Sequence, residues 1–372
     1  MKKSKRVVSY ARDSLFSDLP DPKVSNSEPK IVFYKKEKSR IVPVLDSENV
    51  KLAKKRLKEI RELYWDRIPA RFRDNWNDVA LYAPNGNPVV ATGLMLDPEN
   101  GAYDVENKLN HLTGREWVRL SCSWFIFNAL PSDLAEERTV APESVNHPAT
   151  FSPTMISDFI KLFTKEGDSV LDPFMGIGTS LVACRRTGRI GYGVELNPEF
   201  YETAKKLAPE FKKNMWNQSI ENVEELNLPE ISLIISSPPY WDVLNRSTKD
   251  FRTKRQSKNL KANYSESEDD LGNIADYEAF LSRLTAAYLK CAAFLRPGGF
   301  MVVIVKNVKK SGIVYPLAWD LAKRLSVALT LKDEKIWIQD KAALAPYGYP
   351  HGWASNILHH YCLIFQKPQE SS

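Results

Sequence analysis

The stretch Asp168-Ser-Val-Leu-Asp172-Pro-Phe-Met-Gly176-Ile-Gly178-Thr179 decides the fold of this 372-residue chain. Its first five residues are typical of a short buried strand, and the two glycines turn the chain into a helix that begins near Thr179. Glycines at such a turn allow a ligand to approach the backbone closely, at the carboxyl edge where doubly wound sheets bind their ligands. The stretch therefore predicts one strand–turn–helix unit of an α/β fold, with a ligand site above the turn.

From about residue 150 onward, apolar strands alternate with amphipathic helices. A helix at about 153–164 precedes the strand at 168–172, and a helical stripe follows at 277–295. Further strands are expected at 190–195, 231–235, 300–305, 332–338 and 359–366, with a helix at 316–325. We expect seven strands in all. This alternation is the signature of a mainly parallel sheet with helices on both faces.

An acidic residue, Glu195, ends the strand at 190–195, about twenty residues after the glycine turn. A carboxylate at this place is positioned to bind ribose hydroxyls. A dinucleotide site would have a third glycine where this chain has Leu181, so an adenosyl ligand without a pyrophosphate fits better than a nicotinamide dinucleotide. The alternative is a tight turn whose glycines only pack the helix.

Two consecutive prolines follow the buried strand at 231–235, within Ser237-Pro238-Pro239-Tyr240. Because proline donates no hydrogen bond to a sheet, the pair fixes a rigid extended turn with outward carbonyls. The Ser237 side chain and the Pro238 carbonyl would accept hydrogen bonds from an exocyclic amino group, and the Tyr240 ring would stack on the flat base. The alternative is a proline-rich strand exit without a binding role.

Together these motifs resemble those of the amino-group DNA methyltransferases, which modify cytosine N4 or adenine N6 and use S-adenosylmethionine on a Rossmann-like sheet. The resemblance covers about 147–366 and implies a seven-stranded Rossmann-like methyltransferase sheet. The glycine turn is similar to motif I of the family, Glu195 to the acid of motif II, and His147-Pro-Ala-Thr-Phe-Ser-Pro153 to motif X. The implied S-adenosylmethionine contacts are Phe151, Asp172, Pro173, Phe174, Gly176, Gly178, Thr179, Glu195 and Gln218.

Motif III departs from the family pattern, because Asn217-Gln218-Ser219 stands where the family commonly has Gly-Asp-Ser or Gly-Asp-Ala. An amide therefore replaces the carboxylate that usually binds the cofactor adenine. The catalytic motif IV is matched by Ser237, Pro238, Pro239 and Tyr240, in the form most typical of cytosine-N4 enzymes. The resemblance implies methyl transfer to the amino group of a flipped base, with S-adenosylhomocysteine as product and no metal. Adenine N6 is the alternative acceptor.

The order of the motifs is permuted relative to many enzymes with Ser-Pro-Pro-Tyr, because motifs X and I precede motif IV here. No room for a target-recognition region is left after the last strand. We therefore expect residues 1–146 to form an α+β recognition region ahead of a methyltransferase domain at 147–372.

Basic charge is concentrated near the N-terminus: residues 1–70 hold 18 Lys and Arg against 10 Asp and Glu, whereas the whole chain has a net charge of +6. A helix is expected at 50–64, whose Lys54, Lys55 and Lys58 would contact DNA phosphates. A solvated helix face is the alternative. The segment 241–270 is expected to be a mobile loop over the flipped base, with Lys254 and Arg255 as further DNA contacts; a tolerated surface insertion is its alternative.

The composition argues against a membrane protein, a secreted protein and a disulfide-rich protein. No apolar run reaches the roughly 18–20 residues of a membrane helix, and the N-terminus lacks the apolar core of a secretory signal. The four cysteines are far apart in the sequence, which is typical of reduced thiols. We expect a cytoplasmic protein, associated with the nucleoid if the source is prokaryotic, that binds double-stranded DNA and is accompanied by a separate restriction endonuclease.

Three other functions stay open at this point. An RNA base methyltransferase would use the same pocket chemistry. A nucleic-acid-binding protein with an inactive methyltransferase fold would bind without transferring a methyl group. A protein-glutamine methyltransferase is a weaker third, because that chemistry goes with Asn-Pro-Pro-Tyr.

Overall fold

The computed structural model of the chain describes residues 47–74, 76, 81–82, 94–97, 100–129, 132–133, 135–140, 151–241, 269–310, 312–341, 344, 352–353 and 355–369. It divides into two compact units, Met1–Ser121 and Cys122–Ser372. Within the described part of both units, no helix has the length and apolar composition needed to cross a bilayer.

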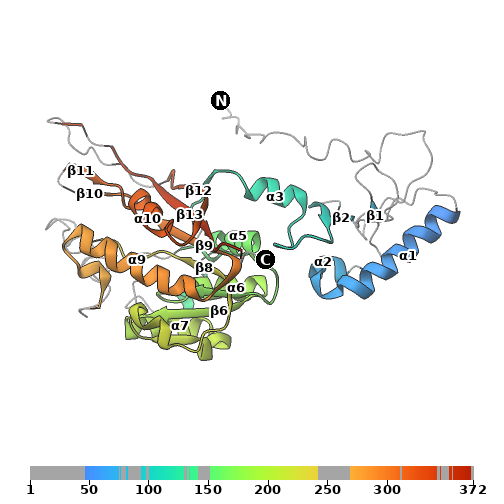
Figure 1. Ribbon diagram of the computed structural model, residues 1–372, viewed down its shortest axis with the longest axis horizontal. Helices are drawn as coiled ribbons and strands as arrows, with labels where there is room; N and C mark the ends of the chain where they lie inside the picture. Colours follow the sequence, from blue (N-terminus) through green and yellow to red (C-terminus); the bar gives the residue numbers. More distant parts are fainter. Residues whose placement is uncertain are drawn as a thin grey trace. The chain divides into compact units, whose positions relative to one another are not determined.

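The larger unit is built on an eight-stranded sheet with the order β4-β12-β13-β9-β8-β5-β6-β7 (Figure 1). The strands are β4 (Trp124–Ile126), β5 (Ser169–Asp172), β6 (Ile190–Glu195), β7 (Met215–Asn217), β8 (Ile231–Ser236), β9 (Leu295–Val305), β12 (Thr330–Ile338) and β13 (His359–Gln366). Neighbouring strands from β7 to β9 run parallel, whereas β13 is antiparallel to both β9 and β12. The expected α/β sheet is confirmed.

Seven strands are expected from the sequence but only six are placed, and the large sheet that the structure describes has eight, so β4 and β7 are the two strands that the sequence does not place. β4 pairs in parallel with β12, with Ile336 opposite Trp124 and Ile338 opposite Ile126. Three residues are too few to show an alternating pattern, so this edge strand is not recognisable from periodicity. Because β4 belongs to the large sheet, the units divide after Ser121, earlier than the boundary expected after residue 146. A recognition role for the N-terminal part stays a prediction.

Helices cover both faces of this sheet. In β6, Val194 belongs to the core formed with α9 and α10, whereas the adjacent Gly193 faces Met175 on the side of α6 and α7. Alternate residues of a strand point to opposite faces, so these two helix pairs lie on opposite sides. The helices are α5 (Pro153–Phe163), α6 (Thr179–Thr187), α7 (Pro198–Leu207), α9 (Tyr277–Ala293) and α10 (Leu317–Leu325), with a short α4 (Ala135–Val140) before them.

The turn between β5 and α6 requires glycine at its last position. Gly178 precedes α6 with φ of 90°, in the left-handed region that favours glycine. A Cβ atom there would also lie 3.0 Å from the Ala204 Cβ of α7. Glycine thus serves both the turn and the close packing of α6 against α7.

The N-terminal unit contains α1 (Ser47–Tyr64), a 3₁₀ turn (Trp65–Arg67), α2 (Ala70–Arg73), the antiparallel strands β1 (Leu81–Tyr82), β2 (Leu94–Asp97) and β3 (Gly101–Asp104), and α3 (Gly114–Leu120). Its small core includes Ile60, Phe72 and Tyr103. The helix expected at 50–64 is confirmed as part of α1. The start of α3 is fixed by a capping box between Thr113 and Glu116.

Candidate active site

A cavity with about 1050 Å³ of open space lies at the carboxyl ends of β5, β6 and β8. Its wall is formed by the residues that follow each of these strands, as expected for a doubly wound sheet. Ten residues predicted from the sequence line it: Phe151, Asp172, Pro173, Phe174, Thr179, Glu195, Gln218, Ser237, Pro238 and Pro239. The turn that follows β5 and the Ser-Pro-Pro turn that follows β8 therefore border the same cavity.

Glu195 is held against the glycine turn by backbone hydrogen bonds. The Gly176 N–H donates to its Oε2 at 2.9 Å, and the Asn197 N–H donates to its Oε1 at 2.7 Å. Burial, with a smaller contribution from the nearby Asp172 carboxyl, raises the pKa of Glu195 from 4.5 to about 7. Among the described residues, no basic side chain pairs with this carboxyl, so its charge is left for a ligand.

Asp172 is a second buried carboxyl at the end of β5. Its Oδ1 accepts a hydrogen bond from the Phe174 N–H at 3.0 Å, and burial raises its pKa from 3.8 to about 6. Two carboxyls that titrate close to neutrality in one cavity are the pattern expected of a functional site.

The cavity fits an adenosyl cofactor. The Thr179 hydroxyl is buried, lines the cavity and has no hydrogen-bond partner in the protein. Such a group needs a ligand or water to offset its desolvation. Phe151 and Ile220 supply apolar surface for a flat base, and the Glu195 carboxylate supplies acceptors for ribose hydroxyls.

The side chains of Asn217 and Gln218, which stand at motif III, make different contacts. The Asn217 side chain donates to the backbone oxygens of Glu195 and Leu196, at 2.8 and 3.0 Å, so it ties β7 to the end of β6. Gln218 lines the cavity while its Nε2 donates to the Asn222 oxygen at 3.2 Å. The Gln218 amide therefore borders the cavity, and its contact with the cofactor stays a prediction.

The Ser237-Pro238-Pro239 turn is anchored on both sides. Before it, the Ser236 hydroxyl and the Tyr288 hydroxyl of α9 form a hydrogen bond of 2.7 Å. The half-buried Ser237 side chain has no partner among the described residues and faces the cavity. Tyr240 lies outside the cavity lining, and its hydroxyl forms a hydrogen bond of 3.2 Å with His360 Nε2. Burial raises the pKa of Tyr240 to about 12.

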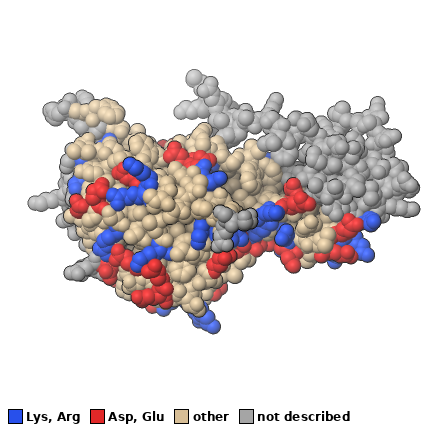
Figure 2. Space-filling view, viewed as in Figure 1, with Lys and Arg blue, Asp and Glu red and all other residues tan. Residues whose placement is uncertain are grey.

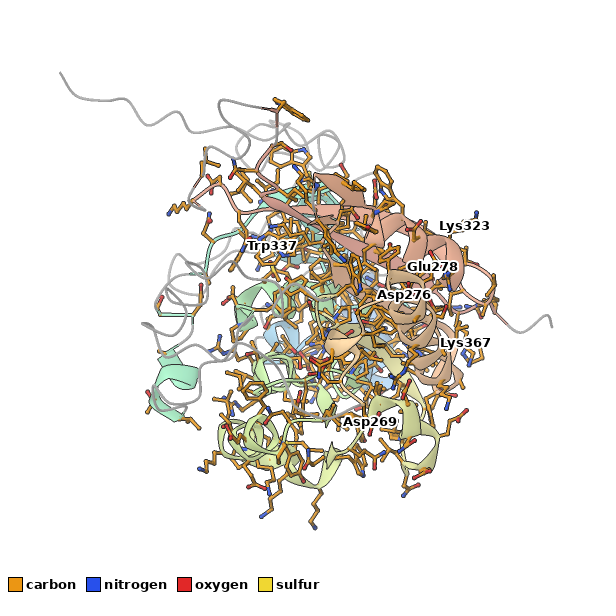
Figure 3. All side chains as sticks on the ribbon, turned by 90° about the vertical axis from the view of Figure 1, so that its left-hand side faces the viewer. Asp269, Asp276, Glu278, Lys323, Trp337 and Lys367 are labelled. Carbon is orange, nitrogen blue, oxygen red and sulfur yellow. The ribbon has the colours of Figure 1, made fainter. Side chains whose placement is uncertain are left out.

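The end of the segment 241–270, which the sequence predicts as a loop over the flipped base, lies against the cavity. Asp269, Asp270 and Leu271 line it just before α9 (Figure 3 labels Asp269). The Asp270 Oδ1 accepts a hydrogen bond from the Gly272 N–H at 2.9 Å, and a Cβ atom on Gly272 would lie 3.5 Å from Pro239 Cβ. The acidic composition of this segment pointed to a loop, and no motif marked its end as part of a site.

Of the five predicted DNA contacts, the structure describes the side chains of Lys55 and Lys58. Lys55 and Lys58 are exposed on α1, and Lys58 forms only an exposed ion pair of 3.9 Å with Glu62. The side chain of Lys54, and the whole of Lys254 and Arg255, lie outside the described residues. On the face of the molecule drawn in Figure 2, basic and acidic side chains are interleaved over the larger unit.

Comparison with known proteins points to one family. A family model described as DNA methylase, of the N6 and N4 methyltransferases, matches residues 2–206, more than half of the chain. The type II methyltransferase M.Cfr9I of Citrobacter freundii is 48% identical over 58 residues, which are 16% of this chain and 19% of that protein. The tRNA (guanine(10)-N2)-dimethyltransferase of Methanocaldococcus jannaschii is 31% identical over 105 residues, 25% of this chain and 30% of that protein.

The chain therefore covers less than a third of the length of either curated relative. Among solved structures, TrmN from Thermus thermophilus has a TM-score of 0.39 and 15% identity, over 60% of this chain and 51% of that one.

Proposed function

The chain belongs to the DNA methylase family of N6 and N4 methyltransferases, and from this premise we propose that it methylates cytosine N4 at a specific sequence in double-stranded DNA. The observation that carries the proposal is the single cavity bordered by both Glu195 and the Ser237-Pro238-Pro239 turn. One wall suits an adenosyl cofactor and the other suits an exocyclic amino group.

The cofactor of the family is S-adenosylmethionine, which supplies a sulfonium methyl group that is already activated for transfer. The protein has to hold and orient it. Glu195 would bind the ribose hydroxyls, Phe151 and Ile220 would enclose the adenine, and Asp172 would face the cationic methionine end. Because both carboxyls lack basic partners among the described residues, they favour a ligand that brings donors or positive charge.

The Ser-Pro-Pro turn would orient the acceptor. Hydrogen bonds from the amino group to Ser237 Oγ and to the Pro238 carbonyl shift its nitrogen towards sp³ geometry, so that the lone pair points towards the methyl group. Alignment of the two reactants then supplies much of the rate acceleration. A strong general base is not required for this step.

Cytosine N4 is the proposed acceptor because the motif begins with serine rather than with the aspartate or asparagine more common in adenine enzymes. The target base has to leave the duplex, at a cost of a few kcal/mol. Stacking on the Tyr240 ring would repay part of this cost. We assign the recognition of the surrounding sequence to the N-terminal basic region, and we expect a separate endonuclease to share the target.

The deciding experiment expresses the full chain in cells without endogenous methyltransferases and maps modified bases in the genomic DNA. N4-methylcytosine confined to one short sequence is expected, and the Tyr240→Ala variant should leave the DNA unmodified. N6-methyladenine instead would overturn the choice of acceptor and keep the reaction class. Methylation of RNA alone would favour the RNA alternative, whereas cofactor binding with no modified nucleic acid would favour an inactive binding protein.

A further inference from the structure

The hydroxyl of Tyr240 is held by a histidine from the far end of the chain. His360 lies on β13, and its Nε2 is 3.2 Å from the Tyr240 hydroxyl. The backbone end of the tyrosine is fixed by the two prolines before it. The ring is therefore restrained at both ends, by the turn at Cα and by the hydrogen bond at the hydroxyl.

His360 is itself held in place. Its ring stacks on Trp337 of β12, with centroids 4.5 Å apart and planes at 24°. The Trp337 Nε1 donates a hydrogen bond to the Phe127 backbone oxygen at 2.9 Å. The Trp337 ring also contacts Phe151, a residue of the cofactor wall, at 5.6 Å between centroids. Figure 3 labels Trp337 on its strand. One layer of rings thus connects the cofactor wall to Tyr240.

Stability alone does not account for a histidine at this position. The His360 Nδ1 is buried and has no hydrogen-bond partner in the part of the chain that the structure describes. An unsatisfied buried polar group lowers the stability of the fold, and an apolar side chain of similar shape would avoid that cost. Among the described residues, the ring makes one hydrogen bond, the one with Tyr240.

The chemical state of the pair is constant near neutral pH. Burial, together with the positive charge of Lys306, lowers the pKa of His360 to about 3, so the imidazole is neutral. Tyr240 keeps its proton because burial raises its pKa to about 12. The contact is a neutral hydrogen bond, which orients the ring without placing a charge beside the flipped base.

We propose that His360 is a positioning residue for methyl transfer, which holds the Tyr240 ring in the orientation needed to stack on the target base. The inference rests on the proposed role of Tyr240. A ring oriented before the base arrives loses less conformational freedom on binding, so the productive geometry is reached more often.

The test compares His360→Leu, His360→Gln, Tyr240→Phe and the double variant His360→Leu/Tyr240→Phe in the full chain. His360→Leu should lower the single-turnover rate on duplex DNA roughly threefold to tenfold, as for the loss of one hydrogen bond. His360→Gln places a polar atom near the lost Nε2 and should recover part of the rate. In the Tyr240→Phe background, His360→Leu should have no further effect, because the shared contact is already absent.

Two measurements do not depend on activity. The melting temperature of His360→Leu without cofactor should equal or exceed that of the wild type, and its calorimetric affinity for S-adenosylmethionine should be unchanged. With 3-fluorotyrosine at position 240, the ¹⁹F resonance of the cofactor-free chain should shift or broaden in His360→Leu. The matched control is His359→Gln, whose half-buried ring contacts Tyr361 and not Tyr240, and which should leave the rate and the resonance unchanged.

Two outcomes separate this inference from the proposed function. A wild-type rate and resonance in His360→Leu, with transfer lost in Tyr240→Ala, would overturn the positioning role and leave the proposed function intact. A wild-type rate in Tyr240→Ala would remove Tyr240 from the site, and the inference would fall with it. A large loss of stability in His360→Leu, with no coupling to Tyr240→Phe, would show a purely structural residue.

Discussion

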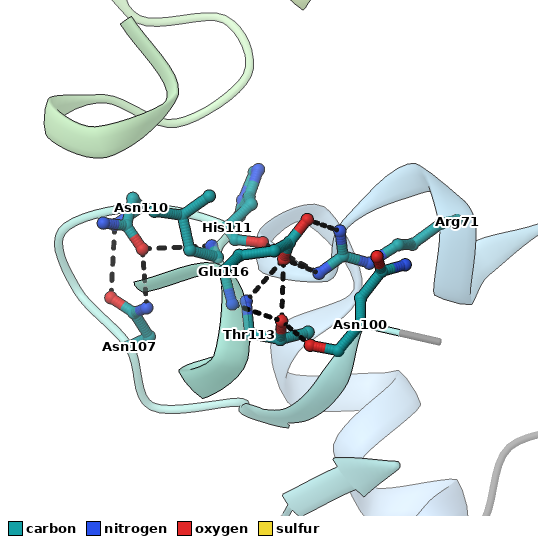
Figure 4. A network of polar contacts seen from close by, with 8 residues as sticks. Arg71, Asn100, Asn107, Asn110, His111, Thr113 and Glu116 are labelled. Carbon is teal, nitrogen blue, oxygen red and sulfur yellow. Dashed lines mark hydrogen bonds and ion pairs between the residues drawn. The ribbon is translucent and has the colours of Figure 1, made fainter. Parts of the chain in front are cut away.

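Two glutamates, one in each unit, show how differently the units use a carboxylate. In the N-terminal unit, Glu116 receives hydrogen bonds from both Arg71 terminal nitrogens, at 3.0 and 2.9 Å, and from the Thr113 N–H at 2.8 Å (Figure 4). In the larger unit, Glu195 receives only two backbone N–H groups, and its pKa is raised to about 7 by burial. The hydrogen bonds of Glu116 are all made within the protein. Glu195 borders a cavity, and its carboxyl oxygens can accept further hydrogen bonds from a ligand there.

The difference indicates which carboxylate serves stability and which serves binding. A carboxylate with a bidentate arginine stabilises the structure around it. A buried carboxylate without a basic partner destabilises the ligand-free protein. Such a group is typical of a binding site, where a bound ligand donates hydrogen bonds that offset the desolvation of the carboxylate. Substitutions at the two positions should therefore have opposite effects on folding and on cofactor affinity.

The largest effect is expected for Glu195→Ala. Its affinity for S-adenosylmethionine should fall by about 1.5–3 kcal/mol, because charge-assisted hydrogen bonds to the ribose are lost. The melting temperature of the cofactor-free variant should not fall, since a poorly solvated carboxyl has been removed. Isothermal titration calorimetry and thermal unfolding measure the two quantities. Equal cofactor affinity in the variant and the wild type would contradict the ribose assignment.

The converse is expected for Glu116→Gln. The Arg71 guanidinium would lose its ionic partner, and the N-terminal unit should be destabilised by about 1–2 kcal/mol, a value reduced by the partial exposure of the pair. Faster hydrogen exchange in α3 would report this loss, while cofactor affinity should stay that of the wild type. A fall in cofactor affinity would contradict the hypothesis that Glu116 contributes to stability and Glu195 to cofactor binding.

Local chemistry explains what the sequence reveals about the larger unit. The glycine turn, Glu195 and the Pro-Pro pair each determine a conformation within a few residues, so both walls of the cavity are predictable from contiguous motifs. β4 and β7 are three residues each and carry no periodic signal. Pairing with β12 and β6 forms them, which is tertiary information.

The unpredicted parts of the site share a second property. His360 is 120 residues from Tyr240 in the sequence, and Asp270 lines the cavity from a segment in which Gly272 approaches Pro239. Neither residue stands in a pattern that specifies a partner. A histidine in an apolar strand is more often a packed residue than a functional one, and the hydrogen bond between His360 and Tyr240 is the observation that favours the proposed positioning role.

The raised pKa values predict a pH dependence for the cavity. Burial raises the pKa of Glu195 to about 7 and that of Asp172 to about 6. Their contribution to the stability of the cofactor-free chain is therefore full below about pH 4 and is lost as the pH rises from there through 6–7. Over the same range the ionised carboxyls become better acceptors, so cofactor affinity should rise by up to about tenfold between pH 6 and pH 8.

Calorimetry across this range, with Glu195→Gln as the matched variant, measures the effect. The neutral amide cannot ionise, so the variant should bind weakly at every pH, and its affinity should change much less between pH 6 and pH 8. A wild-type affinity that is flat over the same range would mean that Glu195 is already ionised in the free protein. The contrast with Glu116 would then rest on geometry alone.

The smallest effect is expected on the basic face of α1, where neither cofactor affinity nor folding should respond. Lys55 and Lys58 are exposed, and the 3.9 Å contact of Lys58 with Glu62 contributes little to stability. In Lys55→Gln/Lys58→Gln, DNA affinity should fall about equally for all sequences, and the log–log dependence on salt should flatten by about one unit for each lost phosphate contact. The control is Lys212→Gln/Lys213→Gln, which removes two exposed lysines from the larger unit. An unchanged salt slope in the α1 variant, together with a flattened slope in the control, would move the DNA-binding surface to the unit that holds the cavity.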